Sequence, residues 1–416
     1  MARTLHEVLT SADYRGKHER YSEQFVNKYN DMADEGNAFS LNLGNIERFD
    51  LIGCQGITGW SGSAWNSSSR AKNMFTKNNR QWQVANLASE KRNEQGVDVE
   101  NTLTLLLGDN FYSDGLGYKK WFSRWNPATS TTFNYNFTRQ PYGRSYAILG
   151  NHDWGLWSHG GSDDCKYKLQ LALNQVEACY DDSAQTRQWN MPYRYYHFTT
   201  EKADFYCIDS SAYPYDEDQQ SWLREVYDRP NKNTQKWQIL ISHHPLIGLG
   251  KRNPFNPKAI KDAYKYSKYF DPGKRKTDFR QQAPYQPHND LLKCALSDFA
   301  FDVILSAHDH TLAGYYINHA NKKTFQVVSG GGGAKREETT RRYINNLIDS
   351  NYVVADAGLE NGGYFLQDQY GYVCMHVDDE QIDFDYYWIG GGEKHITVQK
   401  QRNAQQNEAE NLHLIE

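Results

Sequence analysis

The stretch LTLLLGDNFY, residues 103–112, decides the fold that the sequence predicts. Its first half is a continuous apolar run, typical of a strand buried on both faces, and its second half turns abruptly polar. Six further stretches follow the same rule: FDLIGCQG (49–56), YAILGNHD (146–153), FYCIDS (205–210), WQILISHHP (237–245), FDVILSAHDH (301–310) and FQVVSGGGG (325–333). Because ligands of open α/β sheets bind beyond the carboxyl ends of the strands, these polar residues are expected to meet at one edge.

Helical segments separate these strands. They are expected at about residues 79–94, 166–180, 218–228 and 287–298. Alternation of strand and helix predicts a layered α/β fold. Two later runs, YVCMHV (372–377) and QIDFDYYWI (381–389), predict a closing antiparallel pair.

The chain is expected to hold one main domain. Apolar residues at helical spacing near the N-terminus predict one or two amphipathic helices, so residues 1–45 are interpreted as a helical extension. The main domain would then span residues 46–396, and the polar segment 397–416 would form a C-terminal tail.

Composition excludes several classes of protein. Of the 416 residues 38% are hydrophobic, which is enough for a sizeable core, and the formal net charge of −5 argues against nucleic-acid binding through bulk charge. No run of 18 apolar residues is present, so no membrane-spanning helix is expected. The N-terminus shows no signal-peptide pattern, so a cytoplasmic protein, or one exported by a non-classical route, is expected. The oligomeric state is not predicted.

The six cysteines form no CxxC pair, and their spacing fits neither a disulfide framework nor a zinc finger. Five of them are interpreted as reduced, mostly buried thiols. Cys54 differs because it stands at a strand end beside the other polar motifs.

The ordered set GDNFY, GNHD, HHP and HDH is more specific than any one of its members. Carboxylate, amide oxygen and imidazole are ligands for hard and borderline cations. Two cations about 3.5–4 Å apart can clamp an in-line displacement at phosphorus, and they need a carboxylate between them. Asp109 is the natural candidate for that bridge.

With these motifs the chain resembles the calcineurin-like metallophosphoesterases, and among them the small purple, or tartrate-resistant, acid phosphatases. The resemblance runs from about Phe49 to about Tyr387 and includes connecting stretches such as QWNMPYRYYHF (188–198). It implies an α-β-β-α metallophosphoesterase sandwich with the metal site at the strand carboxyl ends. It also implies a phosphomonoester hydrolase that uses a metal-bound hydroxide and acts on a phosphorylated small molecule or phosphoprotein.

The resemblance assigns a role to each motif residue. The metal ligands would be Asp109 as the bridge, Tyr112 as the phenolate of the ferric site, Asn151, His243, His308 and His310. His152 would contact the phosphoryl group or protonate the leaving oxygen, and Asp153 would orient it. Asn110 would fix the turn and contact substrate, and His244 would bind substrate or simply pack beside the site.

The first motif departs from the family pattern. The family has GDxG there, whereas this chain has Gly53–Cys54–Gln55–Gly56, so Cys54 replaces the aspartate. Asp50 lies four residues back, about 13 Å away on an extended strand, and cannot take its place. A smaller departure is Ala307, which stands before HDH where the family has glycine.

Three interpretations of Cys54 remain open. A thiolate would be a soft ligand that favours zinc or ferrous iron over ferric iron, in a centre of iron paired with iron, zinc or manganese. A weakened first site would leave one metal or low activity. The alternative function is an inactive pseudo-phosphatase that binds phosphate or a partner.

Three further features carry weaker predictions. The basic insertion 251–280 is either a lid that attracts a phosphorylated substrate or an ordinary solvated loop. The glycines 330–333 either cradle a phosphate or form a permissive turn. Two sequons, beginning at Asn66 and Asn136, are weak evidence of glycosylation.

Overall fold

The computed structural model describes most of the chain. The described residues are 3–33, 38–55, 79–112, 115–116, 133, 137–138, 140–156, 164–181, 188–230, 232–250, 252–256, 266, 270, 288–336, 341–354, 356, 359 and 363–400. Most of the basic insertion 251–280, both sequon asparagines and the tail beyond Lys400 lie outside these residues, so the predictions made for them stay predictions.

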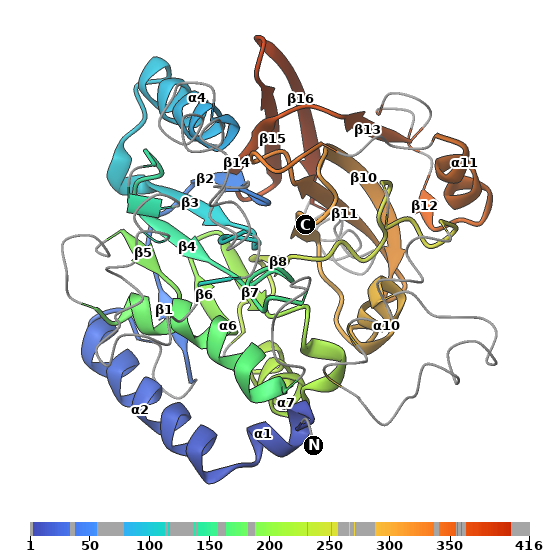
Figure 1. Cartoon of the computed structure of the whole chain (residues 1–416). Coiled ribbons are helices and arrows are strands. Elements are labelled where there is room, and N and C mark those ends of the chain that lie inside the picture. The colour runs from blue at the N-terminus through green and yellow to red at the C-terminus, as the bar shows by residue number, and fades with distance from the viewer. Residues whose placement is uncertain are drawn as a thin grey trace, which may run out of the picture.

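Two sheets form the centre of the described structure (Figure 1). The first has the strand order β1-β6-β7-β8-β9-β11-β10-β12, with β13 also paired to β10, and the second has the order β16-β15-β14-β2-β3-β4-β5. The strands of the first sheet are β1 Ser40–Asn42, β6 Tyr196–Thr199, β7 Ala203–Ile208, β8 Trp237–Ser242, β9 Val303–Ser306, β10 Leu312–His319, β11 Lys322–Ser329, β12 Val353–Val354 and β13 Tyr364–Gln367. Those of the second are β2 Arg48–Ile52, β3 Thr102–Leu106, β4 Ser145–Ala147, β5 Trp189–Asn190, β14 Gly371–Val377, β15 Gln381–Trp388 and β16 Gly392–Gln399.

The strands that carry the motifs run parallel within each sheet. In the second sheet β2, β3 and β4 are parallel neighbours, and in the first sheet β7, β8 and β9 are. The carboxyl ends of parallel strands meet at one edge, which is what the strand-end motifs predicted. The predicted antiparallel pair is also confirmed, because β14 pairs with β15 in that orientation.

Aromatic side chains fill the space between the two sheets. Phe49 of β2 packs on Phe205 of β7 at a ring distance of 4.8 Å, and Phe325 of β11 lies 5.4 Å from Phe384 of β15. Burying each such ring contributes roughly 1.5–3 kcal/mol. This shared core holds the sheets face to face and so holds their carboxyl edges together.

Helices cover the outer faces of this sandwich. They are α4 Arg80–Glu94, α6 Cys165–Cys179, α7 Glu217–Tyr227, α10 His288–Ala295 and α11 Arg341–Asp349, and the first four confirm the predicted helical segments. Arg92 of α4 reaches Asp50 on β2, whereas Tyr227 of α7 packs on Tyr206 of β7, so each sheet has a helix on its outer face. The predicted α-β-β-α layering is therefore confirmed.

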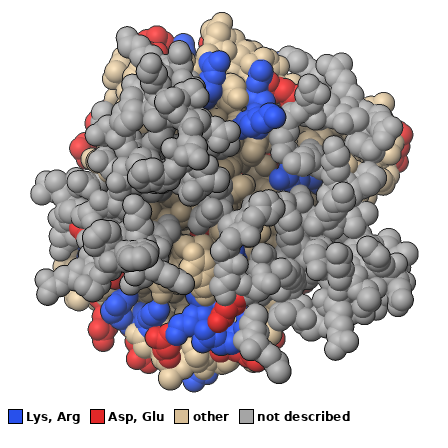
Figure 2. All heavy atoms as spheres, in the orientation of Figure 1, with Lys and Arg blue, Asp and Glu red and all other residues tan. Residues whose placement is uncertain are grey.

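The N-terminal segment is helical as predicted, and it also contributes a strand. Helices α1 Leu5–Leu9 and α2 Ala12–Tyr29 bury the predicted apolar positions, and β1 then pairs with β6 in the first sheet. Figure 1 places these helices along the lower edge of the molecule, where Figure 2 shows Lys and Arg beside Asp and Glu. Three ion pairs join the N-terminal segment to α6 or its N-cap: Arg3–Asp164, Arg20–Glu177 and Lys166–Asp13. Such exposed pairs contribute little, about 0–1 kcal/mol each, so the buried apolar face holds the segment in place.

The boundaries proposed for the domains stay predictions, although β16 extends the ordered sheet to Gln399, past the expected start of the tail. Among the described residues, no helix has both the length and the apolar character needed to cross a bilayer.

Candidate metal centre

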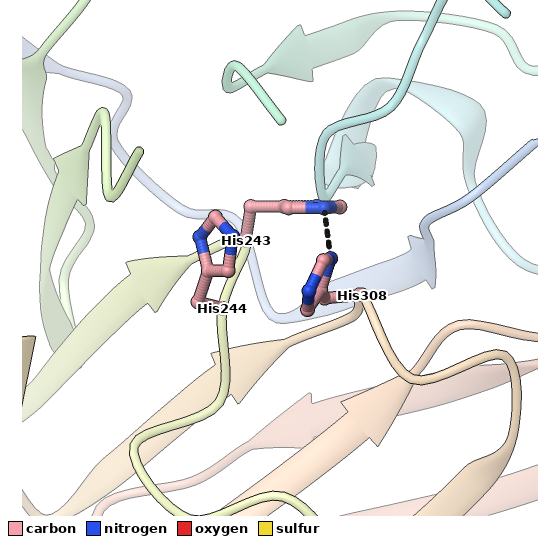
Figure 3. Close-up of side chains that lie close together, drawn as sticks. All are labelled: His243, His244 and His308. Carbon is pink, nitrogen blue, oxygen red and sulfur yellow. Dashed lines mark hydrogen bonds between the residues drawn. The ribbon is translucent and has the colours of Figure 1, made fainter. Parts of the chain in front are cut away.

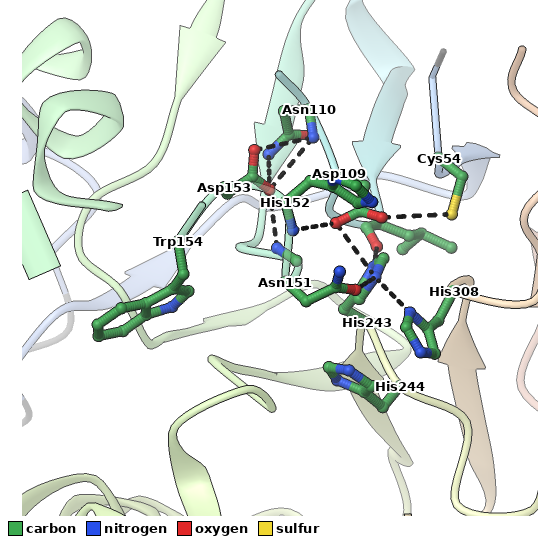
Figure 4. Close-up of polar contacts among 12 residues, drawn as sticks. Cys54, Asp109, Asn110, Asn151, His152, Asp153, Trp154, His243, His244 and His308 are labelled. Atoms are coloured by element: carbon green, nitrogen blue, oxygen red, sulfur yellow. Dashed lines mark hydrogen bonds and ion pairs between the residues drawn. The ribbon is translucent and has the colours of Figure 1, made fainter. Parts of the chain in front are cut away.

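The loops after five strands converge where the two sheets face each other (Figure 4). Cys54 follows β2, Asp109 follows β3 and Asn151 follows β4, while His243 and His308 follow β8 and β9. All five side chains are buried, none more than 2% exposed. Segments that are far apart in the sequence thus bring their chemistry to one place.

Strained backbone marks three of these residues. Cys54, Asp109 and His308 have φ angles of 53°, 56° and 62°, in the left-handed region that non-glycine residues rarely adopt. Such strain costs of order 1–3 kcal/mol per residue and persists only where the surrounding structure imposes it. Here it turns each side chain off its strand toward the common point.

The first cluster of ligand atoms, the His243 group, consists of His243, Asn151, His308 and one oxygen of Asp109. The Nδ1–H of His243 donates to the carbonyl oxygen of Leu107 at 2.8 Å, which leaves the Nε2 lone pair available. Around that Nε2 lie Asn151 Oδ1 at 3.2 Å, His308 Nδ1 at 3.2 Å and Asp109 Oδ1 at 3.4 Å. Figure 3 shows His243 and His308 pointing toward each other.

Two glycines make this close approach possible. A Cβ at Gly150 would lie 2.4 Å from Asp109 Oδ1 and 2.9 Å from the His243 ring, and a Cβ at Gly108 would lie 2.7 Å from His243 Nδ1. Gly108 also has a φ of +85°, which glycine adopts readily. The GD and GN dipeptides of the motifs therefore have a steric reason.

The second cluster, the Cys54 group, consists of Cys54, Tyr112, His310 and the other oxygen of Asp109. Ligand atoms of Cys54, Asp109 and His310 lie within 4.8 Å of one another. Tyr112 Oη donates to Asp109 Oδ2 at 2.8 Å and lies 3.4 Å from His310 Nε2. The Nδ1–H of His310 donates to the carbonyl oxygen of Lys335 at 2.6 Å, so its Nε2 lone pair faces the cluster.

Asp109 lies between the two groups and offers one oxygen to each. Burial alone would raise the pKa of Asp109, but the adjacent His243 and His152 hold that pKa well below its usual range. The carboxylate is therefore ionised at neutral pH and can bridge two cations.

The donor atoms fit metal ions. Around His243 Nε2 the amide oxygen and the carboxylate oxygen are both acceptors, so the cluster needs a proton or a cation at its centre. The set of two imidazoles, an amide oxygen and a carboxylate suits a borderline divalent ion, and the Cys54 group adds a thiol and a phenol. The residues present fit two cations bridged by Asp109.

Comparison with protein-family models gives the family of this chain. The model of the calcineurin-like phosphoesterase family matches residues 78–312, more than half of the chain. The chain belongs to the calcineurin-like phosphoesterase family. No curated protein matches its sequence significantly.

Three solved structures that this chain matches are distant from it in sequence. GAP50, described as the anchor in the inner membrane complex of Plasmodium, shares 16% identity at a TM-score of 0.48, over 87% of this chain and 94% of its own. Purple acid phosphatase PPD1 from yellow lupin (Lupinus luteus) shares 14% identity at a TM-score of 0.48, over 85% of this chain and 53% of its own. PhoD shares 13% identity at a TM-score of 0.46, over 85% of this chain and 70% of its own.

In this calcineurin-like phosphoesterase, His152 lies between the two groups. Its backbone N–H donates to Asp109 Oδ1 at 2.8 Å, and its ring lies 4.2 Å from the ring of Tyr112. It is only partly buried, like His310 and unlike the other ligand candidates. This position suits the predicted contact with substrate, which stays a prediction.

Asp153 braces the loops that carry Asp109 and Asn151. Its carboxylate accepts backbone N–H groups from Gly150 at 2.7 Å, Asn110 at 3.0 Å and Phe111 at 3.1 Å. Burial, reinforced by the charge of Asp109, raises the pKa of Asp153 to about 7. These bonds place Asp153 behind the centre, and its predicted action on the His152 ring stays a prediction.

The two residues predicted to contact substrate lie in the walls. The side chain of Asn110, 1% exposed, donates to Ile148 O at 2.8 Å and accepts from Gln55 at 3.0 Å, which explains the turn. His244 is buried, with Nδ1 2.8 Å from the Ser210 hydroxyl and Nε2 2.7 Å from the Tyr266 hydroxyl. His244 also belongs to a group of possible ligands with His243 and His308, but its two nitrogens are already engaged, so we place it behind the metal centre. Contact of either residue with substrate stays a prediction.

Asp50 is engaged elsewhere, as its position in the strand predicted. Its carboxylate pairs with Arg92 at 2.5 Å and Arg48 at 3.3 Å on the outer side of the sheet. It therefore cannot replace the missing aspartate at position 54.

The glycine run and Ala307 belong to the packing around Cys54. The N–H of Gly332 donates to Gly53 O at 3.1 Å, and the N–H of Ala334 donates to Cys54 O at 3.0 Å. A Cβ at Gly53 would lie 2.3 Å from the Cβ of Ala307, so glycine at 53 accommodates alanine at 307. The run thus holds the Cys54 loop, which favours the structural interpretation over a phosphate cradle.

Sequence reasoning missed Arg252 and Asp309. Arg252 Nε donates to His308 Nε2 at 3.1 Å, and Asp309 Oδ2 accepts from the N–H of Gly250 at 3.0 Å. Two features of the sequence could have drawn attention to these residues: the central aspartate of HDH and the GLG spacing at 248–250. Neither feature shows which residue Arg252 or Asp309 contacts in the fold.

Proposed function

We propose that this protein is a metal-dependent phosphomonoesterase of the purple acid phosphatase type, acting on a phosphorylated small molecule or phosphoprotein. The observation that carries the proposal is the position of Asp109, whose Oδ1 faces the His243 group and whose Oδ2 faces the Cys54 group. One carboxylate between two ligand clusters is an arrangement in which two cations can clamp an in-line displacement at phosphorus.

Two bound cations would polarise the phosphoryl group and lower the pKa of a water molecule. His243, Asn151, His308 and Asp109 would hold one of them, and Cys54, Tyr112, His310 and Asp109 the other.

The remaining residues of the centre would stabilise the reacting oxygens and hold the motif residues in position. His152, beside both groups and partly exposed, would donate a hydrogen bond to a phosphoryl oxygen or a proton to the leaving oxygen. Asp153 holds the backbone of both motif loops, which fixes Asp109 and His152 relative to each other.

The test is hydrolysis of p-nitrophenyl phosphate by purified protein loaded with iron, zinc, manganese or mixed metals. We expect turnover in the wild type and loss of at least about 10³-fold in Asp109→Asn, because the bridge acts on both cations and on the charge that builds in the transition state. Asp378→Asn, which changes an exposed carboxylate paired with Lys202, is the control and should retain activity. Absence of turnover with every metal would refute the proposal.

A second candidate function is a non-catalytic phosphate- or partner-binding protein. The observation that favours it is Cys54, a thiol where the family has an aspartate. Less than one metal per chain by elemental analysis, together with no turnover, would support this alternative.

A further inference from the structure

A positive charge lies against the His243 group. Arg252 Nε donates a hydrogen bond of 3.1 Å to Nε2 of His308, and Arg252 is only 7% exposed. Because arginine stays protonated and has no acceptor, it places a permanent cation beside a candidate metal ligand.

The backbone fixes this position. Asp309, next to His308, accepts the N–H of Gly250 at 3.0 Å and the N–H of Arg252 at 3.4 Å. A Cβ at Gly248 or Gly250 would lie 2.8 Å or 2.9 Å from the Asp309 carboxylate, so the loop closes tightly on it. The guanidinium is therefore delivered to His308 by an anchored loop.

The direction of the hydrogen bonds matters for metal binding. Arg252 occupies the Nε2 lone pair of His308, so a neutral His308 carries its hydrogen on Nδ1, which lies 3.2 Å from His243 Nε2. A cation on His308 Nδ1 would move that hydrogen to Nε2, where it would meet the N–H of Arg252. Two donors would then face each other, in addition to the repulsion between the guanidinium and the cation.

In the Cys54 group, the histidine faces a hydrogen-bond acceptor on its far side and not a cationic donor. There His310 donates its Nδ1–H to the carbonyl oxygen of Lys335 at 2.6 Å, which leaves Nε2 available for a cation. We propose that Arg252 makes the two metal positions unequal, so that the His243 group binds its cation more weakly than the Cys54 group. This inference deepens the proposed function, because it concerns occupancy of the same centre.

The test is calorimetric titration of the metal-free full chain with Zn²⁺, followed by elemental analysis. We expect one tight site and a second site at least about tenfold weaker, because a buried like charge acts through a low effective dielectric. Arg252→Gln should tighten the second site at least about tenfold and leave the first unchanged, whereas Arg252→Lys, which keeps the charge, should stay close to wild type. With Co²⁺, the thiolate–cobalt absorption should appear with the first equivalent, which would assign the tight site to Cys54.

Arg336→Gln is the matched control. Arg336 follows the Lys335 carbonyl that holds His310, but it is exposed and binds Asp368 O and Gln369 at 3.1 Å. Its removal should change neither site. The unfolding transition of each metal-free variant reports its folding, and Arg252→Met replaces Arg252→Gln if the latter is unfolded.

Two equal sites in the wild type, or an unchanged second site in the neutral variants, would overturn the proposal. The titration needs no turnover, so its outcome is independent of whether the protein hydrolyses phosphate esters. The two sites can therefore differ in metal affinity although the hydrolysis assay shows no turnover. Turnover with two sites of equal affinity would be detected as well.

Discussion

The thiol of Cys54 and the carboxylate of Asp109 face each other, with Sγ 4.0 Å from Oδ2. The same oxygen accepts the Tyr112 hydroxyl at 2.8 Å. Burial, with the nearby Asp109 and Cys54, raises the pKa of Tyr112 well above its usual range, so the phenol keeps its proton unless a cation replaces it. We expect the atom that position 54 provides, sulfur or oxygen, to decide the metal preference of this group.

Exchanging that sulfur for oxygen should change which metal binds. We expect Cys54→Asp to bind Fe³⁺ and to gain a visible tyrosinate–iron band, while its Zn²⁺ affinity falls at least about tenfold, because soft thiolates favour zinc and hard carboxylates favour ferric iron. Absorption spectra and metal titration measure both effects. Cys294→Ser, at an exposed cysteine, is the control, and a zinc affinity that does not change in Cys54→Asp would show that the thiol is not a ligand.

Gly150→Ala should disable the centre. The new Cβ would lie 2.4 Å from Asp109 Oδ1 and 2.3 Å from the Asp109 backbone nitrogen, so the bridging carboxylate must move. We expect the metal affinity of the His243 group and the turnover to fall at least about 10²-fold, since a displacement of about 1 Å can have that effect. Gly16→Ala, in α2 with open space around it, should instead stabilise the protein by about 0.5–1 kcal/mol. Wild-type metal binding in Gly150→Ala would show that the cradle tolerates a methyl group.

The sequence predicted the elements better than their long-range partners. Apolar runs located β2, β3 and β8, and the abrupt change to polar residues located the loops that carry Cys54, Asp109 and His243, because both signals are local. The contact between Arg252 and His308 was not predictable, since it depends on how a loop after β8 closes on the residue that follows His308. For the same reason, the pairing of β1 with β6 was missed within a segment whose local pattern is helical.

Arg194 joins the GNHD loop to the N-terminal helices. It pairs with Asp209 at 3.0 Å and Asp216 at 2.8 Å and bonds to the Tyr14 hydroxyl at 3.2 Å, and the residue after GNHD, Trp154, donates to Asp209 at 3.1 Å. Even with Arg194 present, burial raises the pKa of Asp209 to about 6. We expect Arg194→Met to lower the free energy of unfolding by about 3–5 kcal/mol, because it leaves buried carboxylates without their cation.

Urea denaturation of the metal-free protein measures that loss. Adding Asp209→Asn to Arg194→Met should recover part of it, since one uncompensated charge is removed. Arg20→Met, which removes an exposed pair with Glu177, should change stability by no more than about 1 kcal/mol. A similarly small effect for Arg194→Met would show that the network contributes little to stability.

His319, the last residue of β10, should give the protein a pH-dependent stability. Burial, with a smaller effect of Lys293, lowers the pKa of His319 to about 4 from its usual 6.5. Between these pH values the unfolded chain binds a proton at this residue and the folded chain does not, so unfolding takes up a proton. The contribution of neutral His319 to the free energy of unfolding is therefore fully present above pH 6.5 and is lost as the pH falls toward 4. At about 1.4 kcal/mol per pKa unit, the loss is up to ~3 kcal/mol. Burial also lowers the pKa of His288 to about 4, so His288 changes the stability with pH in the same direction.

We expect His319→Gln to flatten the dependence of the unfolding free energy on pH in this window, measured by urea denaturation of metal-free protein. His6→Gln, on the exposed face of α1, is the control for loss of an imidazole. An unchanged slope in His319→Gln would show that His319 titrates alike in the folded and unfolded states.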